Sequence, residues 1–364
     1  MTPVTSATIP RTRTATGLRV PRLAGTAAAG AEVGCMGPKT TRGRLLLASA
    51  PVPRRPNFFI LGAPKCGTTA LSEYLRQHPR AFVSQPKEPH YFCGDFDYYY
   101  APGRRSEEHY LRLFDAATDE HLAVGEASVW YLYSADAARN IAAFDPDARV
   151  IVMLRNPVDL VPSLHSQLLY MLDEDEPDPA RAWELQEPRR RGEHLPPRVR
   201  VPEFLQYGDA ARLGAQLRRV YEALPREQVL TLVFDDLRED TGAVYRRTLE
   251  FLGLPDDGRV DFPRVNENKV HRAGAVARLT QRPPAALVGV ARGVKRVAGV
   301  DRLGVLERVR RGNRQVTRRR QIDPELAAEL RDHFRDDVGE LGELIGRDLG
   351  GWLAPLGGTL DRSR

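Results

Sequence analysis

Hydrophobic and polar positions follow two different periods along the chain after residue 57. Continuous apolar runs predict strands buried on both faces, expected over residues 58–61, 149–154 and 229–234, with a shorter strand over residues 123–126. Between these runs, apolar residues recur every three or four positions, which is typical of amphipathic helices. Such helices are expected over residues 68–77, 160–172, 209–224, 241–252 and 325–345. This alternation predicts an α/β fold in which helices flank a central parallel sheet.

Two segments lack either period. Residues 1–56 are rich in Thr, Ala, Gly, Pro and Arg, with Glu32 as their single acidic residue, and we expect a disordered tail. An Arg-rich targeting peptide and a misplaced start codon are the alternatives for this tail. Residues 57–355 then form one domain, interrupted by a long polar insertion at residues 173–206. An insertion of this kind is a lid, a substrate loop or a disordered segment.

The charge balance favours a small anionic ligand over a nucleic acid. The formal net charge is +6, from 54 basic and 48 acidic residues spread along the chain. No apolar run approaches the ~18 residues of a membrane-spanning helix, so no transmembrane segment is expected. The three cysteines, Cys35, Cys66 and Cys93, have neither a disulfide framework nor metal-ligand spacing. A reduced, cytoplasmic location is therefore expected, and the oligomeric state stays open.

A phosphate-binding loop is predicted directly after the first strand. Gly62 and Gly67 bracket four residues between that strand and a helix, and glycines allow the backbone to approach an anion closely. Backbone N–H groups would hold the anion, together with the hydroxyls of Thr68 and Thr69 and the charge of Lys65. An ATP-binding loop carries its lysine directly after the second glycine, where this chain has Thr68. The pattern indicates a P-loop-type three-layer sandwich with a ligand other than ATP, and a βα turn without a ligand is the alternative.

A second phosphate contact is predicted at the end of the strand over residues 149–154. Arg155 follows this strand, and Ser163 lies eight residues later in the next helix. An arginine at the carboxyl end of a strand, beside a serine near the start of a helix, forms a clamp for a phosphate group. The alternative is an arginine paired with Asp159 or with a helix carbonyl. Pro162 is expected to delay the start of this helix or to kink it, which affects the position of Ser163.

The string Pro64–Thr69 and the Arg155–Ser163 pair resemble sulfotransferases that use 3′-phosphoadenosine-5′-phosphosulfate (PAPS), above all the heparan sulfate sulfotransferases and their bacterial relatives. The resemblance covers residues 57 to about 255. It implies that the 5′-phosphosulfate is bound by Pro64, Lys65, Cys66, Gly67, Thr68, Thr69 and Ala70. It also implies that Arg155 and Ser163 bind the 3′-phosphate, that Tyr207 lies near the nucleotide, and that no metal takes part. Lys65 would stabilise the leaving phosphate as the S–O bond breaks.

A candidate base follows the first helix. The segment Pro86–Phe92 resembles the Lys-Glu-x-x-Phe-Phe element of the heparan-type enzymes, in which a glutamate deprotonates the acceptor. The resemblance implies that Glu88 is the general base and that His90 is a second acid–base group or an orienting group. Lys87 is expected to face the solvent or the acceptor. A charged surface loop without a catalytic role is the alternative.

Three further sets of residues are weaker candidates. Asn268, Lys269 and Arg272 lie where the relatives carry a loop over the nucleotide, although a solvated basic loop fits equally. Some heparan sulfate 3-O enzymes have a lysine after the glutamate that matches Glu126, and this chain has Ala127 there, so that acceptor contact is missing. A set of aromatic residues is expected either in an acceptor cleft or in the core. These residues are Tyr98, Tyr99, Tyr100, Trp130, Tyr131 and Tyr133.

The resemblance implies a PAPS-dependent sulfotransferase that acts on a hydroxyl or an amine of a carbohydrate, a glycolipid or another small molecule. The sequence does not specify the acceptor. A P-loop kinase is one alternative, but it would carry a lysine after Gly67 and an acidic magnesium ligand at a strand end. This chain has Thr68 and Arg155 at those places. A nucleotide-binding protein without activity is the other alternative, against which Lys65 and Glu88 argue, and no nucleic-acid partner is expected.

Overall fold

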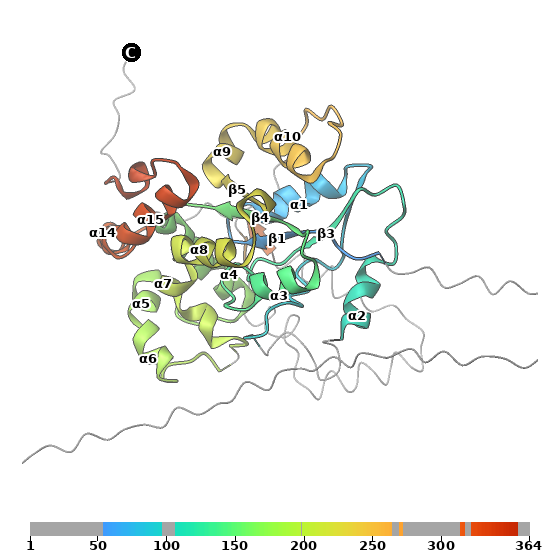
Figure 1. Cartoon of the computed structure of the whole chain (residues 1–364). Coiled ribbons are helices and arrows are strands. Elements are labelled where there is room, and N and C mark those ends of the chain that lie inside the picture. The colour runs from blue at the N-terminus through green and yellow to red at the C-terminus, as the bar shows by residue number, and fades with distance from the viewer. Residues whose placement is uncertain are drawn as a thin grey trace, which may run out of the picture. The chain divides into compact units, whose positions relative to one another are not determined.

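The computed structural model describes residues 54–96, 106–197, 199–263, 269–271, 314–316 and 322–355, all within one compact unit, Pro51–Arg364. A five-stranded parallel sheet forms the core of this unit (Figure 1). In their spatial order, the strands are β2 (Ala81–Val83), β3 (Ala123–Ala127), β1 (Phe58–Gly62), β4 (Arg149–Leu154) and β5 (Val229–Val233). Two short strands, β6 (Lys269–His271) and β7 (Arg314–Val316), form a separate antiparallel pair. The predicted α/β fold is confirmed.

The strand order sends the chain in opposite directions after β1 and after β4. These two strands are neighbours, with Phe58 opposite Arg149 in the register. From β1 the chain crosses to β2 at one edge of the sheet, and from β4 it crosses to β5 at the other edge. Ligands bind at such a switch point, outside the carboxyl ends of the strands, because the connecting segments diverge there. The predicted phosphate loop follows β1 and Arg155 follows β4, so both lie at this point.

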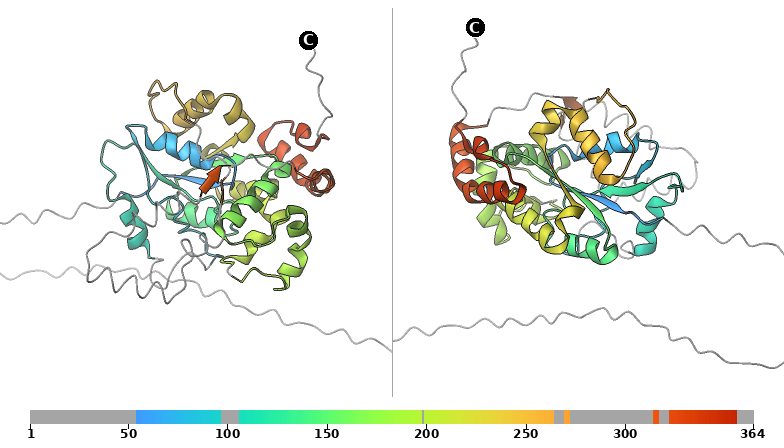
Figure 2. Two further views of the ribbon diagram at one scale, coloured as in Figure 1. Left: turned by 180° about the vertical axis from the view of Figure 1, so that it is seen from behind. Right: turned by 45° about the horizontal axis from the view of Figure 1, so that its top comes forward.

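Helices cover both faces of the sheet, which explains why the strands are continuous apolar runs. Every residue of β1 is buried, as is every residue of β4 after the first. On one face lie α1 (Thr68–Arg76) and α10 (Thr241–Leu252), and on the other lie α3 (Ala137–Phe144) and α8 (Leu213–Ala223) (Figures 1 and 2). The other helices are α2 (Glu107–Leu111), α4 (Pro157–Met171), α5 (Pro179–Glu184), α6 (Gln186–Arg190), α7 (Tyr207–Ala210), α9 (Phe234–Glu239), α14 (Pro324–His333) and α15 (Arg335–Ile345). Short 3₁₀ helices cover Arg112–Phe114, Pro202–Leu205, Arg226–Gln228 and Gly350–Leu353.

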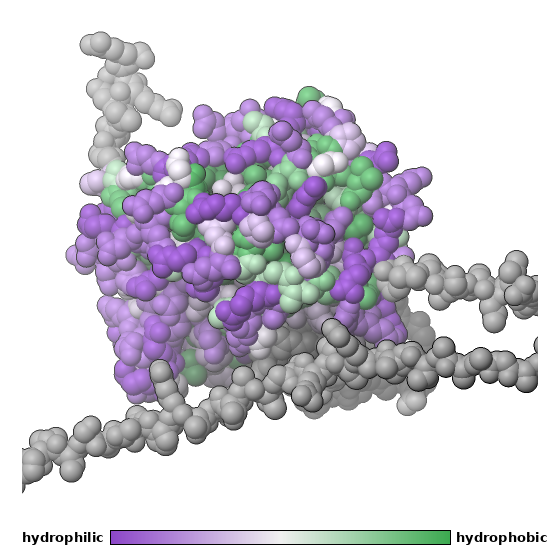
Figure 3. All heavy atoms as spheres, viewed as in Figure 1, coloured by the Kyte–Doolittle hydropathy of each residue, from purple (hydrophilic) through white to green (hydrophobic). Residues whose placement is uncertain are grey.

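The surface is largely polar. Figure 3 shows hydrophilic residues over most of the viewed face, with smaller apolar areas between them. Within the described ranges, no helix combines the length and the hydrophobicity that crossing a membrane would require.

The helix predicted over residues 209–224 is divided into two helices. α7 ends at Ala210 and α8 begins at Leu213. Gln216 donates a hydrogen bond from Nε2 to the carbonyl oxygen of Ala210 (3.1 Å), which satisfies the end of α7. The carboxylate of Asp337, from α15, accepts from two N–H groups in the first turn of α8 (both 3.0 Å). The local period could not reveal this break, because Asp337 is distant in the sequence.

The helix predicted over residues 325–345 is divided in the same way. α14 ends at His333 and α15 begins at Arg335, with Phe334 between them. Phe334 is fully buried, and its ring lies 6.1 Å from the ring of Trp183. The break allows α15 to pack against α8 while α14 packs against α4.

α4 runs from Pro157 through Pro162, so the expected late start of this helix is wrong. Asn156 Oδ1 accepts a hydrogen bond from the second helical N–H group (2.9 Å) and caps the helix. A proline at the first helical position lacks only an N–H group that would have no partner within the helix. Ser163 therefore lies inside α4, where it is buried.

The insertion at residues 173–206 is folded over the part that the structure describes. It contains α5 and α6, and a buried ion pair holds it together. Arg189 donates two hydrogen bonds to the carboxylate of Glu174 (both 2.7 Å), and neither side chain is more than 1% exposed. Tyr207 adds a third hydrogen bond to the same carboxylate (2.6 Å). These contacts exclude a disordered segment over the described residues.

Replacing Arg189 by alanine should destabilise the protein by about 3–5 kcal/mol, because it leaves the Glu174 carboxylate buried without its charged partner. Urea unfolding followed by circular dichroism measures this loss. Arg191→Ala is the matched control, since Arg191 pairs with Glu193 at the surface and its removal should leave the unfolding midpoint unchanged. Equal midpoints for the two variants would show that the buried pair does not hold the insertion.

Candidate active site

The predicted phosphate loop joins β1 to α1, and two glycines determine its path. Gly62 has a φ of 133° and Gly67 a φ of 92°, which residues with a Cβ rarely adopt. A Cβ on Gly62 would lie 2.3 Å from the carbonyl oxygen of Val129. A Cβ on Gly67 would lie 2.7 Å from a methyl carbon of Leu237. Both positions therefore require glycine.

The start of α1 is open to an anion. Gly67 occupies the N-cap position, and no side chain in the described part of the chain caps this helix. By contrast, the side chains of Asn156 and Asp240 cap α4 and α10. The first N–H groups of α1 are therefore donors for a ligand, and the positive end of the helix dipole points at the same place.

The seven loop residues predicted to bind the donor differ in exposure. Half-buried are Lys65, Gly67, Thr69 and Ala70, and buried are Pro64, Cys66 and Thr68. Burial raises the pKa of the Cys66 thiol to about 12, so this side chain stays a neutral thiol. Its Sγ donates a hydrogen bond to the carbonyl oxygen of Pro64 (3.5 Å). The fully buried thiol thus contributes to the shape of the loop.

Arg155 reaches the phosphate loop from the end of β4. Its Nη1 donates a hydrogen bond to the carbonyl oxygen of Lys65 (2.9 Å), and its guanidinium lies 4.7 Å from the ring centroid of Phe234. Arg155 is 8% exposed, and within the described residues its Nε has no hydrogen-bond partner. A buried guanidinium with an unused donor is suited to a phosphate oxygen. The observed contact is with the loop, whereas the alternative predicted a contact with Asp159 or a helix carbonyl.

Lys65 extends from the loop toward α4. Its Nζ donates a hydrogen bond to Oε1 of Gln167 (3.1 Å). Gln167 lies four residues after Ser163, so both side chains are on the same face of α4. Sequence reasoning missed Gln167, and the helical spacing from Ser163 was the signal that could have found it. The structure thus joins Lys65 to α4 through Gln167, and the helical spacing places Ser163 on the same face of α4.

The segment that carries the candidate base lies against the start of α1. Lys87 donates hydrogen bonds from Nζ to Thr69 Oγ1 (3.2 Å) and to Glu88 Oε1 (2.9 Å). One ammonium group thus joins the phosphate loop to the candidate base. Lys87 was expected to face the solvent or the acceptor, but it is only 17% exposed and makes these two contacts instead.

Glu88 is ionised at neutral pH. Burial raises its pKa, but a hydrogen bond with His90 and the charge of Lys87 outweigh burial and lower the pKa to about 2. His90 Nε2 lies 3.5 Å from Glu88 Oε2. Burial lowers the pKa of His90, against the opposite effect of Glu88. His90 is 1% exposed and Glu88 is 35% exposed, so Glu88 is the member of the pair that an acceptor can reach.

Residues 55–265, more than half of the chain, match the model of the sulfotransferase domain family. The chain belongs to this family. The chain also resembles a solved structure, a sulfotransferase from Alicyclobacillus acidocaldarius, with 29% sequence identity and a TM-score of 0.60. That similarity covers 83% of this chain and 100% of the bacterial chain.

Curated relatives match shorter segments of the chain. Carbohydrate sulfotransferase 15 from Homo sapiens is 32% identical over 160 residues, which cover 32% of this chain and 27% of the relative. Heparan sulfate glucosamine 3-O-sulfotransferase 6 from Homo sapiens is 39% identical over 128 residues, which cover 34% of each protein. A membrane-associated sulfotransferase from Dictyostelium discoideum is 34% identical over 106 residues, or 29% of this chain and 21% of that protein. The matches span about a third or less of each relative's length.

Tyr207 lies apart from the contacts that surround the phosphate loop. It is 1% exposed, and its hydroxyl donates to Glu174 in the insertion. Its place near the nucleotide therefore stays a prediction. Asn268 and Arg272 lie outside the described residues, and Lys269 belongs to β6. Among the described residues there is no group of three or more His, Cys, Asp or Glu that could hold a metal ion, and a reaction without metal stays a prediction.

The aromatic candidates that the structure describes lie in the core or pack against it. Trp130 and Tyr131 are buried in the core, as one of the two alternatives predicted. The ring of Trp130 stacks on that of Phe204 with centroids 3.6 Å apart, and the Tyr133 hydroxyl donates to the carbonyl oxygen of Glu203 (3.3 Å). Both contacts attach the insertion to the segment after β3. The tyrosines at positions 98–100 lie outside the described residues.

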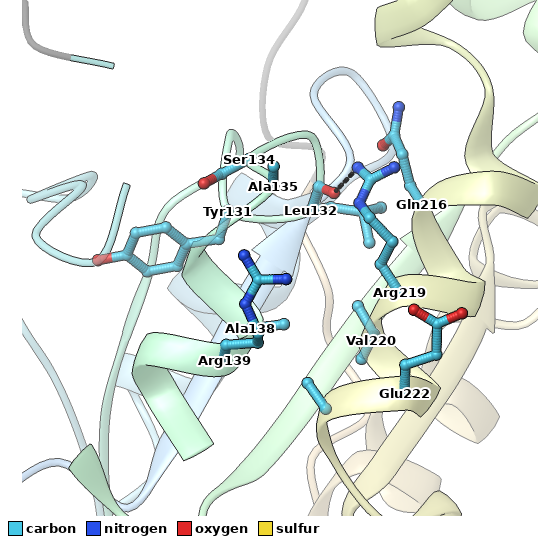
Figure 4. A pocket seen from close by; sticks show the side chains of 11 residues that line it. Tyr131, Leu132, Ser134, Ala135, Ala138, Arg139, Gln216, Arg219, Val220 and Glu222 are labelled. Atoms are coloured by element: carbon cyan, nitrogen blue, oxygen red, sulfur yellow. Dashed lines mark hydrogen bonds between the residues drawn. The ribbon is translucent and has the colours of Figure 1, made fainter. Parts of the chain in front are cut away.

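A cavity of about 120 Å³ lies between α3 and α8 (Figure 4). Its lining includes Arg139 from α3 and Gln216 and Arg219 from α8. Arg219 donates from Nη2 to the carbonyl oxygens of Leu132 and Tyr133 (3.4 and 3.0 Å) and so holds the segment after β3. None of the predicted donor-binding or catalytic residues lines this cavity, so it is not the candidate active site.

Proposed function

We propose that this sulfotransferase transfers the sulfuryl group of PAPS to a hydroxyl or an amine of a carbohydrate, a glycolipid or another small acceptor. The observation that carries the proposal is the hydrogen bond from Arg155 to the backbone of Lys65. It places a buried cation beside the phosphate loop, at the strand end where a kinase needs an acidic ligand for magnesium. Two positive side chains at one loop suit a nucleotide that carries phosphates at two positions.

The phosphate loop would bind the 5′ end of the donor. The N–H groups at the start of α1 and the hydroxyl of Thr69 would donate to its oxygens, and Lys65 would leave Gln167 to reach the oxygen between phosphorus and sulfur. That oxygen gains negative charge as its bond to sulfur breaks, so a cation there stabilises the transition state more than the ground state. Arg155 and Ser163 would bind the 3′-phosphate, which ATP lacks.

Glu88 would accept the proton of the acceptor. The acceptor atom forms its bond to sulfur, the bond between sulfur and the bridging oxygen breaks, and the proton passes to the Glu88 carboxylate. The contacts with Lys87 and His90 keep Glu88 ionised but make it a weak base. We propose that Lys87 turns from Glu88 to the bound donor, which raises the pKa of Glu88 when the reaction needs a base. Buried His90 would orient the carboxylate.

The relatives favour a carbohydrate among the possible acceptors. Two of them are named for carbohydrate and for heparan sulfate glucosamine as acceptors. The proposal of a glycolipid as acceptor rests only on the resemblance of the sequence motifs to PAPS-dependent sulfotransferases. A cytoplasmic location stays a prediction as well, and one relative is named as membrane-associated.

Incubation with ³⁵S-labelled PAPS and a panel of sugars, glycolipids and phenols tests the transfer. Calorimetric titration with 3′-phosphoadenosine-5′-phosphate, the product, and with ATP tests the nucleotide. We expect a labelled carbohydrate product and tighter binding of the product nucleotide than of ATP. Tight binding of ATP without affinity for the product would favour a kinase. Binding of the product without transfer to any acceptor would favour the inactive nucleotide-binding protein.

Replacing Arg155 by alanine should weaken the binding of 3′-phosphoadenosine-5′-phosphate by about 10- to 100-fold, because a hydrogen bond to a charged group contributes about 1.5–3 kcal/mol. Titration of AMP is the control, since AMP lacks the 3′-phosphate and its affinity should change little. Equal losses for the two nucleotides would show that Arg155 acts through the backbone of Lys65 and not on the 3′-phosphate.

A further inference from the structure

A buried carboxylate lies directly behind the candidate base. Glu126, on β3, has no exposed surface, and its carboxylate accepts three hydrogen bonds. The donors are the hydroxyls of Ser128 (2.6 Å), Tyr131 (2.6 Å) and Tyr110 (3.2 Å). A carboxylate without solvent is tolerated only where such donors replace water. Glu126 is therefore the centre of a closed polar network inside the apolar core.

Two of these hydroxyls also hold the backbone of the base segment, residues 84–92. The N–H group of His90 donates to Ser128 Oγ (3.0 Å), and the N–H group of Phe92 donates to the hydroxyl of Tyr131 (3.3 Å). The N–H group of Glu88 donates to the carbonyl oxygen of Ala127, the neighbour of Glu126 on β3 (3.1 Å). The N–H groups of Glu88, His90 and Phe92 thus all donate either to β3 or to a hydroxyl that is bound to Glu126.

The ionised carboxylate determines which way these hydroxyls point. A hydroxyl has one proton, and it accepts well from a backbone N–H group when that proton is directed elsewhere. Glu126 takes the protons of Ser128 and Tyr131, so their lone pairs face His90 and Phe92. The segment needs this support, because Glu88 and His90 have φ values of 66° and 50°. Residues with a Cβ keep such angles only where surrounding contacts impose them.

The network is also attached to the strand that leads into the phosphate loop. The N–H group of Ser128 donates to the carbonyl oxygen of Ile60 (3.1 Å), and that of Leu132 donates to the carbonyl oxygen of Leu61 (2.8 Å). On the other side, Arg219 holds the carbonyl oxygen of Leu132, and Tyr131 points away from Arg219 (Figure 4). The base segment and the phosphate loop are therefore both positioned by β1, the first through the network and the second directly.

We propose that Glu126 is a positioning residue for sulfuryl transfer, which fixes the backbone of residues 88–92 through Ser128 and Tyr131 and thereby directs the Glu88 carboxylate toward the donor. The proposal rests on the proposed role of Glu88 as the base. Glu126 does not touch the substrates, so its effect is on the rate of transfer and not on the affinity for the nucleotide.

Protonation of Glu126 would disturb this arrangement. Burial raises the pKa of Glu126 to about 7, against the lowering effect of its three hydrogen bonds. A protonated carboxyl group must itself donate a hydrogen bond. One of the three hydroxyls then loses its acceptor and is no longer held in one orientation. The groups that act on Glu126 are the hydroxyls of Ser128, Tyr131 and Tyr110 and, from the base segment, the charge of Glu88, which raises the pKa of Glu126. His90 pairs with Glu88. Burial lowers the pKa of His90, and the contacts with His90 and Lys87 lower that of Glu88, whereas burial raises the pKa of Glu126. Loss of the transition on replacement of Glu126 is therefore the result that assigns the transition to Glu126.

Glu126→Gln tests the proposal through the pH dependence of kcat. The wild-type kcat should rise between about pH 6 and pH 8 as Glu126 ionises. At the upper pH, the variant should be about 10²-fold slower, the cost of a small misplacement of a catalytic group, and its rise with pH should be absent. Affinity for 3′-phosphoadenosine-5′-phosphate should be unchanged. A merely structural role would lower kcat by the same factor at every pH and leave the rise in place, which would overturn the proposal.

A second variant, Tyr131→Phe, keeps the test possible if Glu126→Gln does not fold. It removes the hydroxyl that joins Glu126 to the N–H group of Phe92 and changes no charge. Tyr245→Phe is its matched control, since Tyr245 is also a buried tyrosine that donates to a carboxylate, that of Asp257 (3.1 Å). Hydrogen exchange of a peptide with residues 84–93 should be about tenfold faster in Tyr131→Phe, as expected for the loss of one hydrogen bond, and unchanged in Tyr245→Phe. Unchanged exchange and unchanged kcat in Tyr131→Phe would overturn the proposal. A wild-type protein that transfers to no acceptor overturns the proposed function instead, and the exchange result then decides alone whether the network around Glu126 holds the segment.

Discussion

Replacing Lys65 by alanine should reduce kcat for sulfuryl transfer by about 10²–10³-fold, because it removes the cation from the oxygen that leaves with the phosphate. Product affinity should fall far less, since the start of α1 and Arg155 still provide donors. Rapid mixing of the enzyme and acceptor with ³⁵S-labelled PAPS in a single turnover measures the rate of transfer without product release.

Arg218→Ala is the control for the loss of one positive charge, because Arg218 lies at the surface on α8 with 55% of its side chain exposed. Its rate should equal that of the wild type. If Lys65→Ala lost only nucleotide affinity and kept its kcat, Lys65 would contribute to ground-state binding, and its role at the leaving oxygen would be contradicted.

Glu88→Gln should reduce kcat by about 10²–10⁴-fold, the range that a positioned general base contributes. The amide has the shape of the carboxylate and keeps an oxygen for Lys87, so the binding of 3′-phosphoadenosine-5′-phosphate should be unchanged. Steady-state rates and calorimetry on the same preparation separate the two quantities. Because the pKa of Glu88 is about 2 before the donor binds, Glu88 itself should cause no transition in the pH dependence of kcat/KM across the neutral range.

Glu108→Gln makes the same chemical change at the surface, where 77% of the side chain is exposed, and should be silent. An unchanged kcat in Glu88→Gln would exclude Glu88 as the base. A parallel loss of nucleotide affinity would instead show that the substitution displaces Lys87 from Thr69.

The sheet and the phosphate loop could be predicted because their signals are local. All four predicted strands occur within one residue of their expected ends, since a strand covered on both faces must be apolar throughout. Gly62 and Gly67 are required by backbone angles that few other residues adopt, so their spacing revealed the loop. Arg155 could be predicted as a phosphate-binding residue because it comes directly after a buried strand.

The contacts between long polar side chains could not be predicted, because such side chains have no period and their partners are distant in the sequence. Lys65 and Gln167 are 102 positions apart, and Lys87 meets Thr69 only through the fold. The break between α7 and α8 has a similar origin, since the start of α8 is capped by Asp337 from another part of the chain.

The insertion shows that a polar composition alone does not predict whether a segment is exposed or folded. Its Arg, Glu and Pro content is typical of an exposed or disordered segment. Arg189 and Glu174 neutralise each other with two hydrogen bonds, and the pair is then buried as a unit. Nothing in the sequence indicates which of the many arginines of this segment pairs with Glu174.

Among the residues that the structure describes, no side chain caps α1, and this has a consequence for the choice of buffer. Helix caps contribute about 0.5–2 kcal/mol, and α1 receives this contribution only when an anion sits at Gly67. Inorganic phosphate and sulfate offer the same oxygen atoms as the ends of PAPS. Either ion should therefore raise the melting temperature of the protein while it competes with the donor, so a buffer chosen for a high melting temperature would make the donor seem to bind weakly.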